Sequence, residues 1–190
     1  MILPCTRHIP WIVHWHSDVV PSEIDQRMIF AYKLYRPFEQ KLLTKTKTII
    51  ATSEPYLNSS VPLSLWKKKC QVVPLGVDPL RLNQSNTQIK QLWGKNKYKV
   101  LAIGRLTYYK GHDILIRAAS SLPEYKIIIV GKGKMKKHLQ NLITQLGLSK
   151  RVSLIGLLNK QDLHTLIATC DCLCLPSVER TEAFGLVILE

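Results

Sequence analysis

The segment VLAIGRLTYYKGHDILIRA holds the residues best suited to bind a charged ligand. A strand predicted at Lys99–Ile103 ends in Gly104, and Arg105 follows directly. A short loop then leads to Lys110 and to a helix predicted at His112–Ser121. Open α/β sheets bind ligands beyond the carboxyl ends of their strands, where a planar guanidinium and an ammonium group together can hold a diphosphate. Gly104 would let the backbone come close to such a ligand, although either cation alone would equally suit a basic turn.

A second strand, predicted at Lys126–Val130, runs into the turn GKGKMKKHL. Gly131 begins a Gly-x-Gly pair there, but the third glycine of the dinucleotide-binding fingerprint is absent. The pair therefore indicates either a direct contact between backbone and ligand or a tight turn from strand to helix.

Two carboxylates, Glu182 and Glu190, stand eight residues apart in PSVERTEAFGLVILE, and a helix is predicted over Phe184–Glu190. Backbone N–H groups at a helix start attract phosphate, and eight helical residues rise about 12 Å. That rise is close to the reach from a sugar hydroxyl, across a diphosphate, to a ribose. One carboxylate could therefore bind the sugar and the other the ribose, with the phosphates at the helix end.

These turns need parallel strands covered by helices, and the rest of the sequence predicts such a scaffold. Apolar runs alternate with helical stretches, which is typical of βαβ units and of an α/β fold with mostly parallel sheets. Strands are expected at Trp11–Trp15, Thr48–Thr52, Cys70–Val73, Lys99–Ile103, Lys126–Val130, Val152–Ile155 and Cys172–Leu175. Helices are expected at Glu23–Leu43, Pro55–Leu65, His112–Ser121, Met135–Leu146, Lys160–Thr169 and Phe184–Glu190. Pro, Gly, Asn and Ser gather in PLGVDPLRLNQSNTQ, so a domain boundary is expected there, between residues 1–78 and 79–190.

The composition limits the classes of protein that fit. The chain has 190 residues, of which 46% are hydrophobic and 21% charged, as in ordinary globular proteins. Its net charge of +14 implies attraction to an anionic partner, which could be nucleic acid, a lipid surface or a phosphate-bearing substrate. No apolar run reaches the roughly 18 residues of a membrane-spanning helix. Charged residues and prolines interrupt the apolar N-terminal stretch, so a cytoplasmic protein is expected.

Five cysteines agree with that compartment, because an odd number argues against a complete disulfide framework. Three of them alternate in TCDCLCLP, so on a strand their side chains would share one face. No further ligands stand at a spacing that suggests a metal site. Cys170, Cys172 and Cys174 are therefore expected to be buried strand residues, and no metal site is predicted.

Several of these motifs occur together in one order: the VPLGVD hinge, the Gly-Arg-Leu…Lys-Gly turn, the VGKGKMKKHL turn and the Glu-x7-Glu pair. As a set they resemble glycosyltransferase family 4, also called glycosyl transferases group 1, which has the GT-B fold of two facing Rossmann-like domains. The resemblance implies a retaining enzyme of the hexosyltransferase type. It would transfer a sugar from a nucleoside-diphosphate sugar to a glycan or lipid-linked acceptor, with no metal or other cofactor required.

The resemblance also assigns roles to the two halves of the chain. Residues 1–78 match the C-terminal part of the N-terminal, acceptor-side domain, and residues 79–190 match the donor-binding domain without its last elements. The family's N-terminal glycine-rich loop and closing helices have no counterpart here. The chain is therefore expected to be truncated at both ends, which leaves open whether it is active by itself.

Roles for single residues follow from the same resemblance. Arg105 and Lys110 match the pair that neutralises the donor diphosphate, Glu182 the carboxylate on the donor sugar, and Glu190 the carboxylate on the ribose. His16, in IVHWHSDVVP, matches the strand-end histidine that faces the sugar and the acceptor, with His14 as its neighbour. Ile155, Gly156 and Leu157 match the backbone segment beside the nucleobase, and Phe184, Gly185 and Leu186 match the segment along the sugar and phosphates. Gly104 and Gly131, in the turns described above, complete the expected donor-binding residues.

Other functions fit part of these observations. An epimerase or phosphorylase of the same fold would share the donor site, and an inactive remnant would share the sequence. The charge of +14 permits nucleic-acid binding, but no reader motif is found, so nucleic acid is not an expected partner. Basic surfaces are also drawn to anionic lipids, which would bring the protein to the inner face of a membrane. The sequence does not specify the sugar, the nucleobase or the acceptor.

Overall fold

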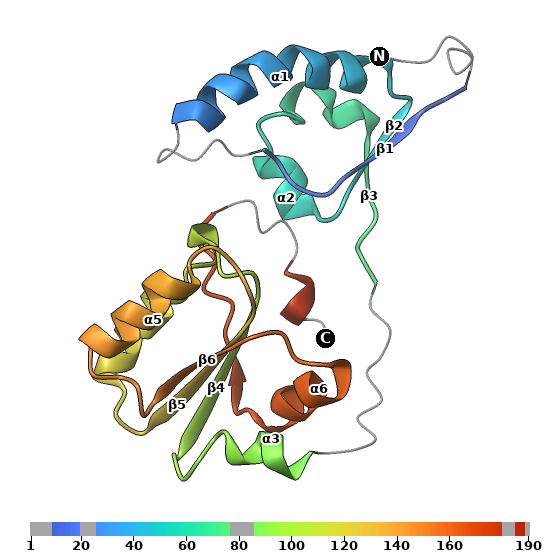
Figure 1. The fold of residues 1–190 in the computed structure, drawn as a ribbon. Helices are drawn as coiled ribbons and strands as arrows, with labels where there is room; N and C mark the ends of the chain where they lie inside the picture. Colours follow the sequence, from blue (N-terminus) through green and yellow to red (C-terminus); the bar gives the residue numbers. More distant parts are fainter. Residues whose placement is uncertain (1–8, 20–25, 77–85, 180–184, 189–190) are drawn as a thin grey trace. The chain divides into compact units, whose positions relative to one another are not determined.

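The computed structural model describes residues 9–19, 26–76, 86–179 and 185–188. These residues belong to two compact units, the first within residues 9–76 and the second made of residues 86–179 with 185–188 (Figure 1). The domain boundary predicted near residue 78 lies outside the described residues. None of the described helices is both long and apolar enough to cross a lipid bilayer.

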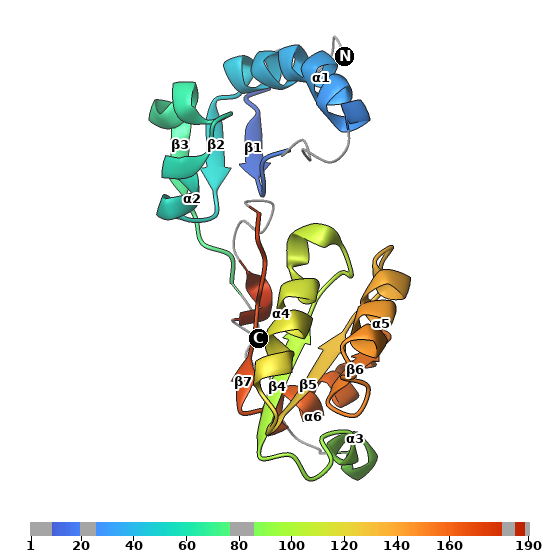
Figure 2. The same ribbon diagram turned by 90° about the vertical axis from the view of Figure 1, so that its left-hand side faces the viewer.

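A three-stranded parallel sheet forms the centre of the first unit (Figure 2). Its strands lie in the order β1 (Ile12–Trp15), β2 (Thr48–Ala51) and β3 (Cys70–Val72). The connecting segments are α1 (Gln26–Lys45), α2 (Glu54–Ser59) and the 3₁₀ segment η2 (Ser64–Lys69). The Ser53 hydroxyl caps α2 by accepting a hydrogen bond from the Tyr56 backbone N–H at 3.3 Å.

The core of the first unit joins this sheet to both helices. Leu43 of α1, Ile49 of β2 and Leu57 of α2 are buried in one cluster with Trp15, Ala51, Tyr56 and Leu63. Because each such side chain contributes about 1.5–3 kcal/mol when it is removed from water, the cluster fixes where β1 ends. The loop that carries His16 begins at that point.

The second unit contains a four-stranded parallel sheet in the order β6-β5-β4-β7. The strands are β4 (Tyr98–Ile103), β5 (Tyr125–Val130), β6 (Val152–Ile155) and β7 (Cys172–Leu173). The α-helices are α3 (Thr87–Gln91), α4 (His112–Ala118), α5 (Lys136–Gln145) and α6 (Lys160–Thr169). Three short 3₁₀ segments complete the unit, η3 (Tyr108–Lys110), η4 (Ala119–Ser121) and η5 (Leu186–Ile188).

Strand β5 is apolar on both faces because helices cover both sides of the sheet. Ile127 and Ile129 pack into a cluster with α4 and α5, whereas Ile128 packs on the other side with Trp93 and Leu166. Figure 1 shows α5 and α6 on these opposite sides. This is the burial expected for a parallel strand, and it leaves only the strand ends open to a ligand.

All seven predicted strands are present, with ends that shift by at most two residues. The helix predicted at Pro55–Leu65 is instead α2 followed by η2, since Pro62 follows shortly after the end of α2 and cannot continue a helix. Of the helix predicted over Phe184–Glu190, only residues 185–188 are described. Leu186–Ile188 form the 3₁₀ turn η5, and Gly185, with φ +67°, does not have right-handed helical geometry.

The predicted burial of the three cysteines on one face of a strand is wrong in two respects: only Cys172 lies in β7, and Cys170 and Cys174 do not share a face. Cys170 and Cys174 are partly buried and pack against clusters on opposite sides of the second sheet, but Cys172 is exposed. Strand β7 is a two-residue strand at the edge of the sheet, and among the described residues none buries the Cys172 side chain. Across the described residues no group of three His, Cys, Asp or Glu side chains could hold a metal ion.

Candidate functional site: a basic strand edge with glycine turns

The loop that follows β4 carries both predicted cations of the donor site. The Gly104 N–H donates to the carbonyl of Val130 at 3.0 Å, so β4 and β5 remain paired up to this point. Arg105 is exposed and Lys110 is half-buried. The stem of Lys110 runs over Gly104, since a Cβ built on this glycine would lie 3.4 Å from the lysine Cε and 3.7 Å from Nζ. The Lys110 side chain therefore packs directly against Gly104.

The two glycines after β5 are required because this turn packs closely against the loop that follows β4. A Cβ on Gly131 would overlap the carbonyl oxygen of Gly104, and a Cβ on Gly133 would overlap the backbone of Leu106. The Leu106 N–H donates to the carbonyl of Lys132 at 2.9 Å, and the Leu106 carbonyl accepts from the Met135 N–H at 3.0 Å. The Gly-x-Gly pair thus forms a tight turn that holds the loop of Arg105 in place.

The end of β6 completes this edge of the sheet. The carbonyl of Ile155 accepts a hydrogen bond from the Gly131 N–H at 3.0 Å, Gly156 is half-buried and Leu157 is exposed. The Cε atom of Lys132 lies 4.0 Å from the position of a Cβ on Gly156. Lys132 is thus a third basic side chain at the edge. The sequence reasoning missed it, although it follows its strand as directly as Arg105 follows β4.

The segment after β7 also reaches this edge. Gly185 is buried, and its φ of +67° is a conformation that favours glycine. A Cβ on it would lie 3.0 Å from Cδ2 of Leu175, two residues after β7. Leu186 is exposed in η5. The predicted site residues Glu182, Phe184 and Glu190 lie outside the described residues.

A buried histidine lies next to the two cations along the chain. His112 is 2% exposed at the start of α4, and neither ring nitrogen makes a hydrogen bond of standard geometry with the described residues. Burial lowers its pKa, the charge of Lys110 acts in the same direction, and the backbone of Arg105 and the Asp113 carboxylate oppose the change. The imidazole is therefore neutral near pH 7, and Arg105 and Lys110 supply the positive charge of this loop.

The predicted histidine of the acceptor side belongs to the first unit. His16 is exposed just after β1, and its ring centroid lies 4.1 Å from that of His14. Two residues further on, the carboxylate of Asp18 is buried and holds this loop to the rest of the unit.

Three side chains donate hydrogen bonds to one oxygen, Oδ1 of Asp18. They are Trp15 Nε1 at 2.9 Å, the Tyr56 hydroxyl at 2.6 Å and the Ser60 hydroxyl at 2.8 Å. Burial raises the pKa of Tyr56, and its hydrogen bond to Asp18 raises it further, so the phenol remains a donor. The sequence reasoning did not find this network, because its donors stand up to 42 residues from the acid.

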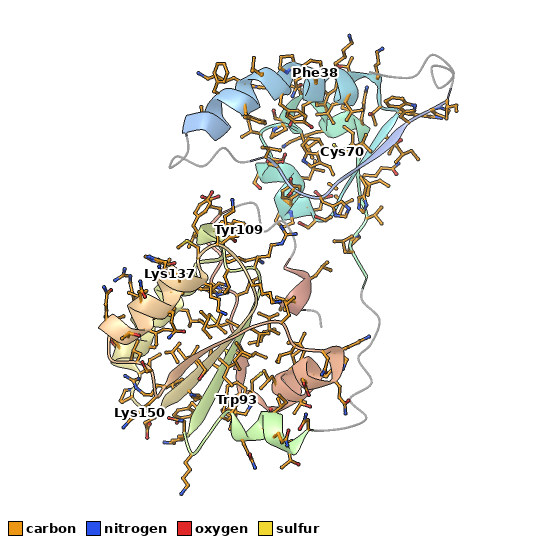
Figure 3. The ribbon with its side chains drawn as sticks, viewed as in Figure 1. Phe38, Cys70, Trp93, Tyr109, Lys137 and Lys150 are labelled. Atoms are coloured by element: carbon orange, nitrogen blue, oxygen red, sulfur yellow. The ribbon has the colours of Figure 1, made fainter. Side chains whose placement is uncertain are left out.

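In the second unit, the carboxyl ends of β4, β5 and β6 bring together most of the described site residues. These residues are Gly104, Arg105, Lys110, Gly131, Ile155, Gly156 and Leu157. Figure 3 labels Tyr109 on η3 in the same loop as the two cations. Such an edge, with basic side chains and closely packed glycine turns, is where α/β folds bind phosphorylated ligands.

The comparisons with known proteins identify the class of protein. The family described as "Glycosyl transferases group 1" matches residues 83–190, which is more than half of the chain. The chain therefore belongs to the glycosyl transferases group 1 family.

Particular relatives extend the match into the first unit. The chain is 33% identical over 184 residues to O-antigen chain mannosyltransferase C of Escherichia coli, a match that covers 94% of this chain and 46% of the relative. It is 32% identical over 183 residues to D-rhamnosyltransferase WbpZ of Pseudomonas aeruginosa, with 95% and 46% covered. The chain thus spans about half the length of these relatives.

A solved structure supports the fold. Anabaena Alr3699/HepE, in complex with UDP and glucose, matches with a TM-score of 0.69 and 27% identity, over 95% of this chain and 49% of that protein. The predicted fold class, α/β with the parallel sheets of the GT-B glycosyltransferases, is confirmed.

Proposed function

We propose that this chain is part of a retaining family 4 glycosyltransferase, which transfers a sugar from a nucleoside-diphosphate sugar to a glycan or lipid-linked acceptor. The observation that carries the proposal is the placement of Arg105 and Lys110 on one loop beyond β4, packed against the glycine turn of β5. Residues 79–190 would form the donor-binding domain, and residues 1–78 would belong to the acceptor-side domain.

The chemistry follows from the charge that develops when the donor breaks. As the bond between the sugar and the nucleoside diphosphate lengthens, negative charge builds up on the leaving phosphate. Arg105 binds this phosphate through its planar fork and Lys110 through its ammonium group, and both are positioned before the reaction starts. These two cations would stabilise the leaving phosphate, as a metal ion does in other transferases. Attack by the acceptor on the same face would retain the configuration of the sugar.

The other predicted residues would complete the donor and acceptor sites. The backbone at Gly156 and Leu157 would lie beside the nucleobase, and that at Gly185 and Leu186 along the sugar. Glu182 would bind the sugar and Glu190 the ribose, with Phe184 between them. His16 would orient the sugar or the acceptor, without acting as the sole base.

Replacement of the two cations in the intact protein tests this mechanism. Arg105→Ala and Lys110→Ala should each lower sugar transfer by about a hundredfold or more, while the circular dichroism spectrum stays unchanged. Lys97→Ala is the matched control, because Lys97 is an exposed cation before the amino end of β4, where it pairs with Glu124 at 3.8 Å.

The assay follows products from a set of nucleoside-diphosphate sugars with a glycan acceptor. Transfer is thereby distinguished from isomerisation of the donor and from phosphorolysis, which an epimerase or a phosphorylase would catalyse. Normal transfer by a variant that lacks both cations would rule out the proposed stabilisation of the leaving group.

We also propose a peripheral contact between this protein and an anionic membrane, through α1. Phe30, Leu34 and Phe38 stand four residues apart on one side of this helix and are 65%, 60% and 71% exposed. Lys41 and Lys45 continue the same side, and the only acid of the helix, Glu39, is buried. Exposed apolar side chains beside lysines suit the boundary between headgroups and acyl chains.

Sedimentation with lipid vesicles tests this contact. The protein should sediment with vesicles that contain phosphatidylglycerol and much less with vesicles of phosphatidylcholine alone. Phe38→Ser should weaken sedimentation, whereas Leu65→Ser, which changes an exposed apolar residue on η2, should not. Binding that does not depend on anionic lipid would exclude the electrostatic part of this proposal.

A further inference from the structure

Two loops that are distant in the sequence are joined beside the candidate donor site. The Val178 N–H donates to the carbonyl of Tyr109 at 2.9 Å, and the Tyr108 hydroxyl donates to Oε2 of Glu179 at 2.9 Å. Gly111, with φ +62°, packs so closely that a Cβ would overlap the carbonyl oxygen of Pro176. The segment after β7 therefore holds η3 by contacts of three kinds, which join residues 176–179 to residues 108–111.

Lys110 belongs to the turn that these contacts hold. Residues 108–110 form one turn of 3₁₀ helix, so its orientation sets the direction in which the lysine leaves the backbone. The contacts to Pro176 and Glu179 lie on either side of Lys110, one at Gly111 and the other at Tyr108. If the turn rotated, the ammonium group would leave its place over Gly104.

The bond between Tyr108 and Glu179 is the only one of these contacts that depends on polar side chains. A phenol that donates to a carboxylate is a charge-assisted hydrogen bond, stronger and more directional than a neutral one. Both residues are half-buried, so water competes with this bond less than at an exposed site.

We propose that Tyr108 and Glu179 form a positioning pair that holds Lys110 for the donor diphosphate. Neither side chain contacts the donor; the pair acts through the turn and therefore affects the phosphate contact selectively. This inference rests on the proposed function, because it assumes that Lys110 binds a diphosphate. It adds to that function a pair of residues outside the predicted donor site.

Calorimetric titration of the intact protein tests the pair, with UDP and GDP as probes and uridine and guanosine as the matched nucleosides. Tyr108→Phe should weaken binding of the preferred nucleoside diphosphate about tenfold and leave binding of its nucleoside unchanged. Glu179→Gln, which keeps an acceptor oxygen, should have a smaller effect than Glu179→Ala. Tyr109→Phe is the control, because it removes a neighbouring hydroxyl that makes no hydrogen bond with the described residues.

A double-mutant cycle distinguishes an effect on the position of Lys110 from a general loss of structure around the site. In a Lys110→Met background, Tyr108→Phe should cause no further loss, since both changes act on the same contact. An additive loss, or an equal loss of nucleoside and nucleoside diphosphate, would overturn the positioning role.

The same titrations show which proposal fails. If the wild-type protein binds neither diphosphate, the proposed function and this inference fail together. If the wild type binds and Lys110→Met loses binding while Tyr108→Phe does not, only the inference fails.

Discussion

Replacement of Asp18 by alanine should lower the stability of the first unit. The carboxylate is 7% exposed, and its Oδ1 atom accepts hydrogen bonds from Trp15, Tyr56 and Ser60. Alanine would remove the acceptor and leave three donors in a buried place. Because Trp15 ends β1 and Tyr56 lies in α2, the change would separate the His16 loop from its support.

The size of the effect can be worked from these contacts. A hydrogen bond to a charged group contributes about 1.5–3 kcal/mol. Three donors that share one oxygen cannot each reach that value, and water can enter the space that the carboxylate leaves. We therefore expect the free energy of opening of the first unit to fall by about 3 kcal/mol, which corresponds to about a hundredfold larger population of its open state.

Amide hydrogen exchange is the suitable assay, because two compact units need not unfold in one step. Protection of the β2 amides should fall about a hundredfold in Asp18→Ala. Tyr56→Phe, which removes one donor, should cost about 1 kcal/mol. Asp171→Ala, which removes an acceptor of the Lys99 N–H in the second unit, should leave β2 unchanged.

Two results would refute this reasoning. If the exchange protection of the β2 amides changes less than about twofold in Asp18→Ala, the three donors must form hydrogen bonds with water that replace those to Asp18 with little loss of free energy. A loss in Asp18→Asn as large as in Asp18→Ala would show that charge alone matters, since asparagine retains an oxygen for the donors.

Two further predictions concern the second unit. Burial lowers the pKa of His112, so the unfolded chain binds this proton more readily. The stability of the unit should therefore be complete above about pH 6.5 and fall as the pH drops towards the folded pKa. His112→Leu should flatten this acid dependence in urea titrations. Gly131→Ala should lower the melting temperature by several degrees, about 1–3 kcal/mol, because its Cβ meets the Gly104 carbonyl. Gly156→Ala, whose Cβ would meet only the Lys132 side chain among the described residues, should leave the melting temperature unchanged in calorimetry.

The strands could be predicted because each carries its own signal. In β5, the run IIIV before a glycine is apolar on both faces, which is typical of a strand that helices cover on both sides. The helix α3 was not predicted, because its five residues are too few to show a helical period beside the boundary segment. The predicted last helix is wrong at Gly185, whose positive φ lies outside the right-handed helical region and is not signalled by the local pattern.

The candidate site could be predicted only as far as its residues follow strands. Arg105 and Lys110 were found because a strand, a glycine and a basic loop stand in sequence. Asp18 was missed because its role depends on donors brought to it by α2 and the loop after it, which no local pattern reveals. The pairing of Tyr108 with Glu179 was missed for the same reason, since 71 residues separate them.

The glycines and cations of the second unit depend on one another. Both lysines at the carboxyl edge lie beside a glycine: the Lys110 stem runs over Gly104, and Lys132 reaches towards Gly156. A side chain on either glycine would take space beside a lysine that would face the phosphates. The neutral His112 adds no charge of its own to the repulsion between these cations. The placement of the positive charge at this edge therefore depends on the glycine turns as well as on the basic residues. A substitution that alters one of these turns should weaken diphosphate binding even when every cation is retained.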